Sequence, residues 1–471
     1  MSDAFAPPGA WRRAVVLLTV ALAFGCGRQP AEPVDHVLLI TVDTLRADRI
    51  DAFGGSFGLT PHLDALAQQS VRFETAYAAA PFTLPSVAAL MTGTAPEALG
   101  VYRNESTVPD AVPTLASRLR SAGWQTHAVV SNFVLRSSSG IDLGFERFDD
   151  SFPQREVVRL WPERIAVDTT DAALEQLDAC ALRSDAPCFL WVHYQDPHGP
   201  YTPPDGFLEP ELQKQARLPD AARELPVSPN HLGHGAIPTY QVIDGHRDIG
   251  FYRASYHAEI RYLDTEIGRL LRALDERGLT ERSLVVFAAD HGEGLGEEDY
   301  WFAHGEYLND ALVRVPLLFR VPGRPPRARS DVAALTDVLP TMLAALDLEP
   351  TTPGPDGRDL LAPGAEKESS RPYFAALDSA RHRRYGLVEG EFKLVVTEQD
   401  GIGRAQLSRR GRDAVDMTAA APQVVASMRR HLNRIRDQLR RNARPEVLQD
   451  LSTQDRENLR ALGYVEGPND P

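Results

Sequence analysis

The sequence His36-Val-Leu-Leu-Ile-Thr-Val42, followed directly by Asp43-Thr-Leu-Arg-Ala-Asp48, decides the fold class of this chain. A continuous apolar run of this length is typical of a β-strand that is buried on both faces. Such strands belong to parallel sheets whose two faces are covered by helices. Open sheets of this kind place functional side chains just after the carboxyl ends of their strands. Asp43 is therefore a candidate functional residue.

The rest of the chain continues this alternation of strands and helices. Buried strands are expected over residues 126–130, 189–193, 284–289 and 315–321, and helices over 63–69, 115–121, 165–182 and 248–277. The alternation predicts an α/β fold, with a mostly parallel sheet flanked by helices. Residues 203–247 are rich in Pro, His and Gly and show no period, which predicts a surface insertion near the site.

The first 34 residues differ from the rest of the chain. Arg12 and Arg13 precede an apolar run over 14–24 that suits an export signal but is too short to cross a bilayer. Cys26 and a polar stretch follow, so residues 1–34 are interpreted as a lipoprotein-type signal and tether. The expected location is the periplasm of a bacterium, or a membrane reached through a lipid on Cys26. Ordinary signal cleavage is the alternative.

The C-terminal part of the sequence also differs from the main part in composition and in the pattern of expected elements. Residues 351–364 read as a Pro/Gly linker, residues 384–397 as a hairpin around Gly390, and residues 422–440 and 453–462 as helices. The main α/β domain is therefore expected over residues 35–350. Residues 351–471 are expected to form the linker and a small α+β C-terminal subdomain.

The net charge limits the classes of molecule that the protein can bind. The net charge of −15 argues against nucleic acid as a partner, because nucleic acid needs a basic face. The charge does not argue against a small anionic substrate, since a few local cations and a metal can outweigh the average negative potential of the protein.

Cys180 and Cys188 are either a small disulfide loop or two buried thiols.

The stretch Pro81-Phe-Thr-Leu-Pro-Ser-Val-Ala-Ala-Leu-Met-Thr-Gly-Thr94 predicts a short helix over residues 84–91, with Thr83 at its entrance. A helix start offers unpaired N–H groups and a positive dipole end, which suit a tetrahedral anion. A hydroxyl at this place can attack such an anion if its pKa is lowered. The alternative is that Thr83 only caps the helix by accepting the N–H of Ser86.

Three further segments supply groups that could activate Thr83. Asp43 and the pair Asp290-His291 follow buried strands, so two carboxylates and one imidazole could hold a divalent ion with Thr83 as the fourth ligand. The ion could be Ca, Mn, Mg or Zn. His198, His304 and Asn104 are candidates for holding the remaining oxygens and protonating the leaving group. Each residue alone could also be an ordinary turn or loop residue.

Five motifs together resemble the sulfatase branch of the alkaline phosphatase superfamily. They are Val42-Asp43-Thr44-Leu45-Arg46-Ala47-Asp48, Thr60-Pro61-His62-Leu63-Asp64, the stretch from Pro85 to Gly93, Asp196-Pro-His198-Gly-Pro-Tyr201, and Asp290-His291-Gly292-Glu293. The resemblance implies an alkaline-phosphatase-like catalytic domain with one divalent metal ion beneath the nucleophile. It implies that Asp43, Asp290 and His291 bind that ion, with Thr44 a weaker candidate. Thr83 takes the position of the nucleophile.

Departures from the family pattern bear on the substrate. Formylglycine sulfatases carry Cys or Ser in place of Thr83, and Thr cannot become formylglycine because its β-carbon carries a methyl group. Val87 stands where they have Arg, and Ser131-Asn132-Phe133 replaces Lys-Trp-His. Asn104 falls where phosphate-cleaving relatives hold an oxyanion with Asn. His304 falls where phosphoethanolamine transferases have His.

The sequence thus predicts a metal-dependent hydrolase of sulfuric, phosphoric or phosphonic esters, with a phospho-threonine or sulfo-threonine intermediate. The alternatives are a transferase that passes a phospho-group to a cell-envelope glycan or lipid, and a non-catalytic envelope-binding lipoprotein.

Overall fold

The computed structural model describes Met1 and residues 34–155, 162–183, 186–229, 232–349, 356–368, 373–378, 383–399 and 402–461. The predicted signal and tether, with Cys26, therefore lie outside the described residues apart from Met1 and Val34. Within the described residues, no helix has both the length and the apolar character needed to cross a membrane.

A nine-stranded sheet forms the centre of the molecule, in the order β11-β2-β10-β8-β1-β7-β3-β4 with β9 paired to β2. β1 (His36–Val42) lies between β7 (Cys188–Tyr194) and β8 (Ser283–Ala289) and is parallel to both. β3 (Gln125–Val130) and β4 (Arg147–Asp149) extend the parallel part beyond β7. The apolar side chains of β1 are buried, as the uninterrupted run predicts for a central parallel strand.

The other end of the sheet is mixed. β10 (Leu317–Arg320) runs antiparallel to β8 and to β2 (Val71–Tyr77), while β11 (Arg327–Ala334) is parallel to β2 and the short β9 (Arg314–Val315) is antiparallel to it. Neither β2 nor β11 was expected from the sequence. The predicted strand over 315–321 is interrupted and forms parts of β9 and β10. The sheet is mostly parallel, as expected, but not wholly so.

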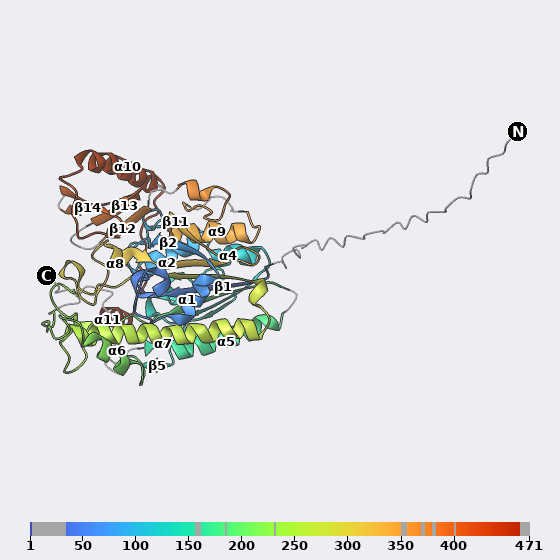
Figure 1. The fold of residues 1–471 in the computed structure, drawn as a ribbon, viewed down its shortest axis with the longest axis horizontal. Coiled ribbons are helices and arrows are strands. Elements are labelled where there is room, and N and C mark those ends of the chain that lie inside the picture. Colours follow the sequence, from blue (N-terminus) through green and yellow to red (C-terminus); the bar gives the residue numbers. More distant parts are fainter. Residues whose placement is uncertain are drawn as a thin grey trace.

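Helices cover both faces of this sheet (Figure 1). One face carries α7 (Ile249–Glu276), with α5 (Ala166–Ala181) and α1 (Pro61–Gln68) packed against it. The other face carries α2 (Thr83–Thr92), α4 (Leu115–Ser121) and α9 (Val338–Ala345), with the short α3 (Pro96–Leu99) beside α2. The 203–247 insertion contains α6 (Leu208–Gln215), which packs on α7, so this segment is more regular than its composition suggests.

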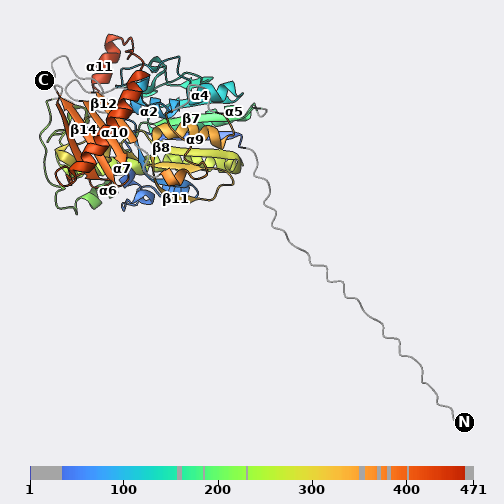
Figure 2. The ribbon, with the colours of Figure 1, turned by 90° about the horizontal axis from the view of Figure 1, so that it is seen from above.

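The C-terminal part forms a second, antiparallel sheet in the order β12-β13-β14-β15. Its strands are β12 (Tyr373–Asp378), β13 (Arg383–Glu389), β14 (Phe392–Gln399) and β15 (Ile402–Arg409), and α10 (Pro422–Arg441) lies across them (Figure 2). Leu387, Leu394 and Leu407 of the sheet pack with Met428 and Leu432 of α10 in a small separate core. α11 (Thr453–Ala461) is the last described helix.

Two covalent or ionic links join neighbouring elements. A disulfide connects Cys180, near the end of α5, to Cys188, the first residue of β7. The ammonium group of Lys393 on β14 is buried and pairs with Asp310 at 2.6 Å and with Asp413 at 3.0 Å. Asp310 begins α8 (Asp310–Val313) of the main domain, so Lys393 connects the two parts of the chain.

Candidate active site

Thr83 is the first residue of α2, and its side chain does not cap the helix. Phe82 is the N-cap residue, and the N–H of Ser86 donates to the carbonyl oxygen of Phe82 at 3.2 Å. The capping alternative for Thr83 is therefore wrong. The Thr83 hydroxyl is fully buried and lies 3.5 Å from Oδ2 of Asp43 and 3.4 Å from Nε2 of His291.

Fewer N–H groups are free at the start of α2 than the sequence led us to expect. Asn104 accepts the N–H of Leu84 at 2.9 Å through its Oδ1, Pro85 has no N–H, and Ser86 donates to Phe82. Side chains must therefore supply part of the anion-binding donors. The Nδ2 group of Asn104 is buried and has no hydrogen-bond partner among the described residues, so it remains available as a donor.

Asp43, Asp290 and His291 come together because β1 and β8 are adjacent and parallel. Val42 lies opposite Ala289 in the register, and the N–H of Asp290 donates to the carbonyl oxygen of Val42 at 3.0 Å. Nε2 of His291 lies 3.4 Å from Oδ1 of Asp43 and 3.8 Å from Oδ2 of Asp290. Together with Thr83, we call these residues the reactive cluster.

The charges in the reactive cluster are unbalanced. Burial raises the pKa of Asp43 well above its usual range, and burial together with the Asp43 charge does the same to the pKa of Asp290. Oδ1 of Asp43 and Oδ2 of Asp290 have no hydrogen-bond partner among the described residues, and neither does Oγ1 of Thr44. Two buried carboxylates with unpaired oxygens fit a cation at this place.

The imidazole of His291 is held in the tautomer that a metal ion needs. Its Nδ1 lies 2.9 Å from the carbonyl oxygen of Gly292, which can only accept, so Nδ1 carries the proton. Nε2 therefore presents its lone pair to Asp43 and Thr83. Burial also lowers the pKa of His291, which keeps the ring neutral. The donor set of the reactive cluster thus fits a divalent metal ion.

Two residues that the sequence analysis left without a role also touch this region. The amide Nδ2 of Asn132 donates to Oδ2 of Asp43, and its Oδ1 accepts the N–H of Val134 at 2.8 Å. Glu293 is buried and accepts the Tyr201 hydroxyl at 3.0 Å, and its other oxygen lies 3.4 Å from Nδ1 of His304. Glu293 is the last residue of the motif that begins at Asp290, so its position in the sequence was a usable signal.

The predicted histidines lie next to the reactive cluster. The centre of the His304 ring lies 4.6 Å from that of His291 and 5.1 Å from that of His198. Nδ1 of His198 lies 2.8 Å from the carbonyl oxygen of Gly199, which leaves Nε2 as its basic nitrogen. Tyr240, from the 203–247 insertion, stacks near His198 with a ring separation of 6.2 Å. The insertion therefore reaches the site, as the sequence predicts.

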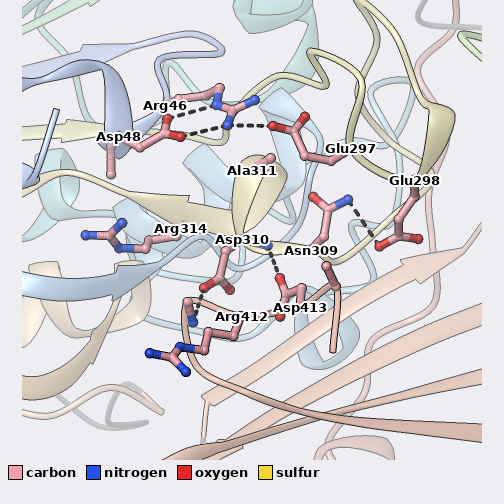
Figure 3. Close-up of a pocket in the computed structure, with 13 residues that line it drawn as sticks. Arg46, Asp48, Glu297, Glu298, Asn309, Asp310, Ala311, Arg314, Arg412 and Asp413 are labelled. Carbon is pink, nitrogen blue, oxygen red and sulfur yellow. Dashed lines mark hydrogen bonds and ion pairs between the residues drawn. The ribbon is translucent and has the colours of Figure 1, made fainter. Parts of the chain in front are cut away.

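A cavity of about 450 Å³, lined largely by charged residues, lies between the main domain and the loop after β15 (Figure 3). Its walls include Arg46, which pairs with Asp48 and Glu297, and also Asp310 and Asp413. None of the reactive cluster lines it. Because its charges largely pair with one another, this cavity belongs to the contact between the two parts of the chain.

Comparisons with known proteins agree with this architecture. The family model described as Sulfatase matches residues 35–348. Human iduronate 2-sulfatase (Homo sapiens) is 28% identical over 423 residues, covering 72% of this chain and 75% of the relative.

Two solved structures share the fold. One is BT4656 in complex with its substrate D-glucosamine-2-N,6-O-disulfate, with a TM-score of 0.70 and 18% identity, covering 86% of this chain and 97% of that one. The other is phosphonate monoester hydrolase of Agrobacterium radiobacter, with a TM-score of 0.66 and 21% identity, covering 86% and 96%. The fold is thus the alkaline-phosphatase-like one of sulfatases. The matched residues include the whole reactive cluster, and the chain belongs to the sulfatase family of sulfuric and phosphoric ester hydrolases.

Proposed function

We propose that this chain is a metal-dependent hydrolase that cleaves sulfuric, phosphoric or phosphonic esters with Thr83 as its nucleophile. The observation that carries the proposal is the position of the Thr83 hydroxyl, buried within 3.5 Å of both Asp43 and His291. A threonine hydroxyl without such partners has a pKa far too high to attack an ester at neutral pH.

Sulfatases generally depend on a divalent metal ion, and the buried carboxylates here are possible ligands. Asp43, Asp290, His291 and Thr83 would hold that ion in this chain. When bound, the ion supplies the positive charge that lowers the pKa of a nearby hydroxyl and offsets the two carboxylates. The residues themselves orient Thr83, because His291 is fixed by Gly292 and Asp43 by Asn132.

The proposed reaction has two steps. Oγ1 of Thr83 gives its proton to the neighbouring carboxylate of Asp43 and forms a bond to the sulfur or phosphorus atom. The bond to the leaving oxygen breaks, and that oxygen takes a proton from His198 or His304 in the protonated imidazolium form. In the second step the oxygen of a water molecule forms a bond to the sulfur or phosphorus atom, the neutral histidine takes a proton from that water, and the bond to Oγ1 of Thr83 breaks. Oγ1 recovers its proton from Asp43, so the site returns to its starting state. Nδ2 of Asn104 donates to an oxygen of the transferred group, since this buried nitrogen has no other hydrogen-bond partner in the part of the chain that the structure describes.

A phosphate-type ester is the favoured substrate class. No Arg or Lys stands at position 87 or 131–133, where formylglycine sulfatases hold sulfate, and Asn132 is used to hold Asp43. A doubly charged phosphate ester is matched better by a metal ion with imidazoles than a singly charged sulfate ester is. The fold shared with a phosphonate monoester hydrolase is compatible with this choice, while the iduronate 2-sulfatase relative keeps sulfate esters in the test.

An activity panel tests the proposal. Aryl sulfate, phosphate monoester, phosphodiester and phosphonate monoester are each offered with Ca²⁺, Mn²⁺, Mg²⁺ or Zn²⁺. Thr83→Ala should abolish cleavage of every active substrate while circular dichroism stays that of the wild type. Thr83→Ser, which keeps the hydroxyl, should retain measurable activity. A Thr83→Ala protein that cleaves at the wild-type rate would remove Thr83 from the mechanism.

The transferase alternative rests on Thr83 and His304, which match residues of phosphoethanolamine transferases. Single-turnover assays with and without a glycan or lipid acceptor separate the two activities. Release of free phosphate or sulfate without acceptor supports the hydrolase. Purified protein with no bound divalent ion would instead favour a non-catalytic binding role.

We also propose that residues 1–34 direct export and that Cys26 carries a lipid. Cys26→Ala should then move the protein from the detergent phase to the aqueous phase of a bacterial extract. Equal partitioning of both forms would leave only ordinary signal cleavage.

A further inference from the structure

His193 on β7 is a buried histidine that the proposed reaction does not use. β7 pairs with β1, and the register places His193 directly opposite Thr41, two residues before Asp43. Its side chain is fully buried. Nδ1 lies 2.8 Å from Oγ1 of Thr41, and Nε2 has no hydrogen-bond partner among the described residues.

The imidazole of His193 lies unexpectedly close to two carboxylates of the reactive cluster. One ligand atom each of Asp43, His193 and Asp290 lie within 4.8 Å of one another. Because Nδ1 is occupied by Thr41, the nitrogen left for a ligand is Nε2. Ligand atoms of a tetrahedral zinc ion are about 3.3 Å apart at ordinary Zn–N and Zn–O lengths. The three side chains would therefore have to approach one another by up to about 1.5 Å to hold one ion.

The surroundings of His193 have the form of a metal-ligand support. A histidine that binds a metal normally donates its other ring N–H to a fixed acceptor. In the tautomer that carries the proton on Nδ1, Oγ1 of Thr41 is that acceptor. This oxygen is itself fixed, because Nε1–H of Trp191 donates to it at 2.8 Å. With Nδ1–H directed at Thr41, Nε2 of His193 presents its lone pair.

We propose that Nε2 of His193 binds the same ion as Asp43 and Asp290, and that the centre therefore prefers an imidazole-binding transition-metal ion such as Zn²⁺ to Ca²⁺. The inference rests on the metal site of the proposed function and specifies its chemistry. Ca²⁺ takes oxygen ligands, whereas imidazole nitrogen suits Zn²⁺ and its neighbours. Two imidazoles, from His193 and His291, beside two carboxylates make an unsuitable site for Ca²⁺.

The test measures metal binding rather than activity. Metal-free protein is titrated with Zn²⁺ and with Ca²⁺ in competition with chelators, and Cu²⁺-loaded protein is examined by electron spin-echo spectroscopy, which counts bound imidazoles. His193→Gln should weaken Zn²⁺ binding at least tenfold, change Ca²⁺ binding less than threefold, and reduce the imidazole count from two to one. His127→Gln is the matched control, because His127 is a buried histidine on β3 beside Cys180. It should change neither affinity nor count.

Other outcomes overturn the inference in distinguishable ways. A single imidazole in the wild-type spectrum assigns the nitrogen to His291 alone and removes His193 from the centre. Equal weakening of Zn²⁺ and Ca²⁺ in His193→Gln means that Nε2–H only supports a carboxylate. A wild-type protein that binds no ion overturns the proposed metal site as well.

A second variant covers the case in which His193→Gln does not fold. Thr41→Val keeps the shape at position 41 but removes the acceptor for Nδ1. It should weaken Zn²⁺ binding by about tenfold and leave the imidazole count at two, because the ligand itself is retained. Unchanged Zn²⁺ affinity in a folded Thr41→Val protein contradicts the inference.

Discussion

The hydroxyl of Tyr256, in the middle of α7, donates to the carbonyl oxygen of Thr44 at 2.7 Å. Thr44 follows Asp43 and has a φ of 54°, a left-handed conformation that a β-branched residue rarely adopts. The N–H of Thr44 donates to Oδ1 of Asp290 at 3.2 Å. The long helix therefore holds a strained backbone turn between two residues of the reactive cluster.

We predict that Tyr256→Phe loosens this turn. The carbonyl oxygen of Thr44 and the N–H of Arg46 would both lose their partner, so the free energy of unfolding should fall by about 1–3 kcal/mol. The affinity for divalent metal should fall as well, since Asp43 and Asp290 lose their fixed spacing. Urea unfolding and chelator competition measure the two effects.

Tyr252→Phe is the control for this helix. Tyr252 lies one turn earlier on α7 and bonds to the backbone of Ile243 and His246, outside the reactive cluster. It should lower stability without changing metal affinity. If both variants bind metal as the wild type does, Tyr256 only stabilises the fold.

Glu293 gives a prediction for pH. Burial raises the pKa of Glu293 to about 8, well above its value in an unfolded chain, about 4.3. Between these values the folded state binds more protons than the unfolded state, so the stability contributed by neutral Glu293 is lost as pH rises from about 4.3 to about 8. The slope from this one group is at most about 1.4 kcal/mol per pH unit.

Glu293→Gln should remove this component. Its free energy of unfolding, measured in urea on metal-free protein at pH 5, 7 and 8.5, should fall less with pH than that of the wild type. The amide keeps an acceptor for the Tyr201 hydroxyl, which limits the structural cost. Parallel pH curves for the two proteins would show that Glu293 is ionised throughout this range.

Two substitutions at Asn104 should separate its two roles, which are capping of α2 and binding of the substrate. Asn104→Asp keeps the oxygen that accepts the N–H of Leu84 but loses the Nδ2 donor and adds a negative charge. We expect kcat/KM to fall by about 10²–10³ with little loss of stability. Asn104→Ala should also lose about 1 kcal/mol of stability, because the helix cap is gone. An Asn104→Asp enzyme with unchanged kcat/KM would exclude a contact between Nδ2 and the transferred group.

The disulfide should contribute to stability and not to catalysis. Cys180 and Cys188 close a short loop, so replacing both with Ala should lower the free energy of unfolding by about 2.5 kcal/mol. Cleavage rates at 25 °C should stay those of the wild type, since neither residue touches the reactive cluster. A large loss of kcat in the folded double variant would contradict this, because it would link the start of β7 to the chemistry.

Much of the fold was predictable because burial leaves a clear pattern in the sequence. The run before Asp43 and the run before Asp290 both read as buried strands, and adjacent parallel strands must place their carboxyl ends together. The strand β2 was missed because Val71–Tyr77 mixes buried and exposed residues and follows a helix closely. The antiparallel direction of β10 is set by tertiary pairing, which no local pattern records.

The residues of the site could be predicted from the sequence only where they belong to a recognisable motif. His193 lies inside a strand that reads as simply apolar and buried, and only its register with Thr41 places it near Asp43. Asn132 lies in the segment where formylglycine sulfatases have Lys-Trp-His, so no family motif indicated its contact with Asp43. The N–H groups of α2 looked available because a sequence cannot show that Asn104 reaches back to Leu84.

The buried ammonium of Lys393 limits how far this protein can be shortened. Its partner Asp310 begins the short helix whose Leu312 carbonyl accepts the N–H of Gly292, the neighbour of His291, at 2.8 Å. A truncation that stops near residue 350 would remove Lys393 and leave Asp310 without this cation, close to the reactive cluster. The minimal unit for engineering this enzyme therefore includes the terminal sheet together with the main domain.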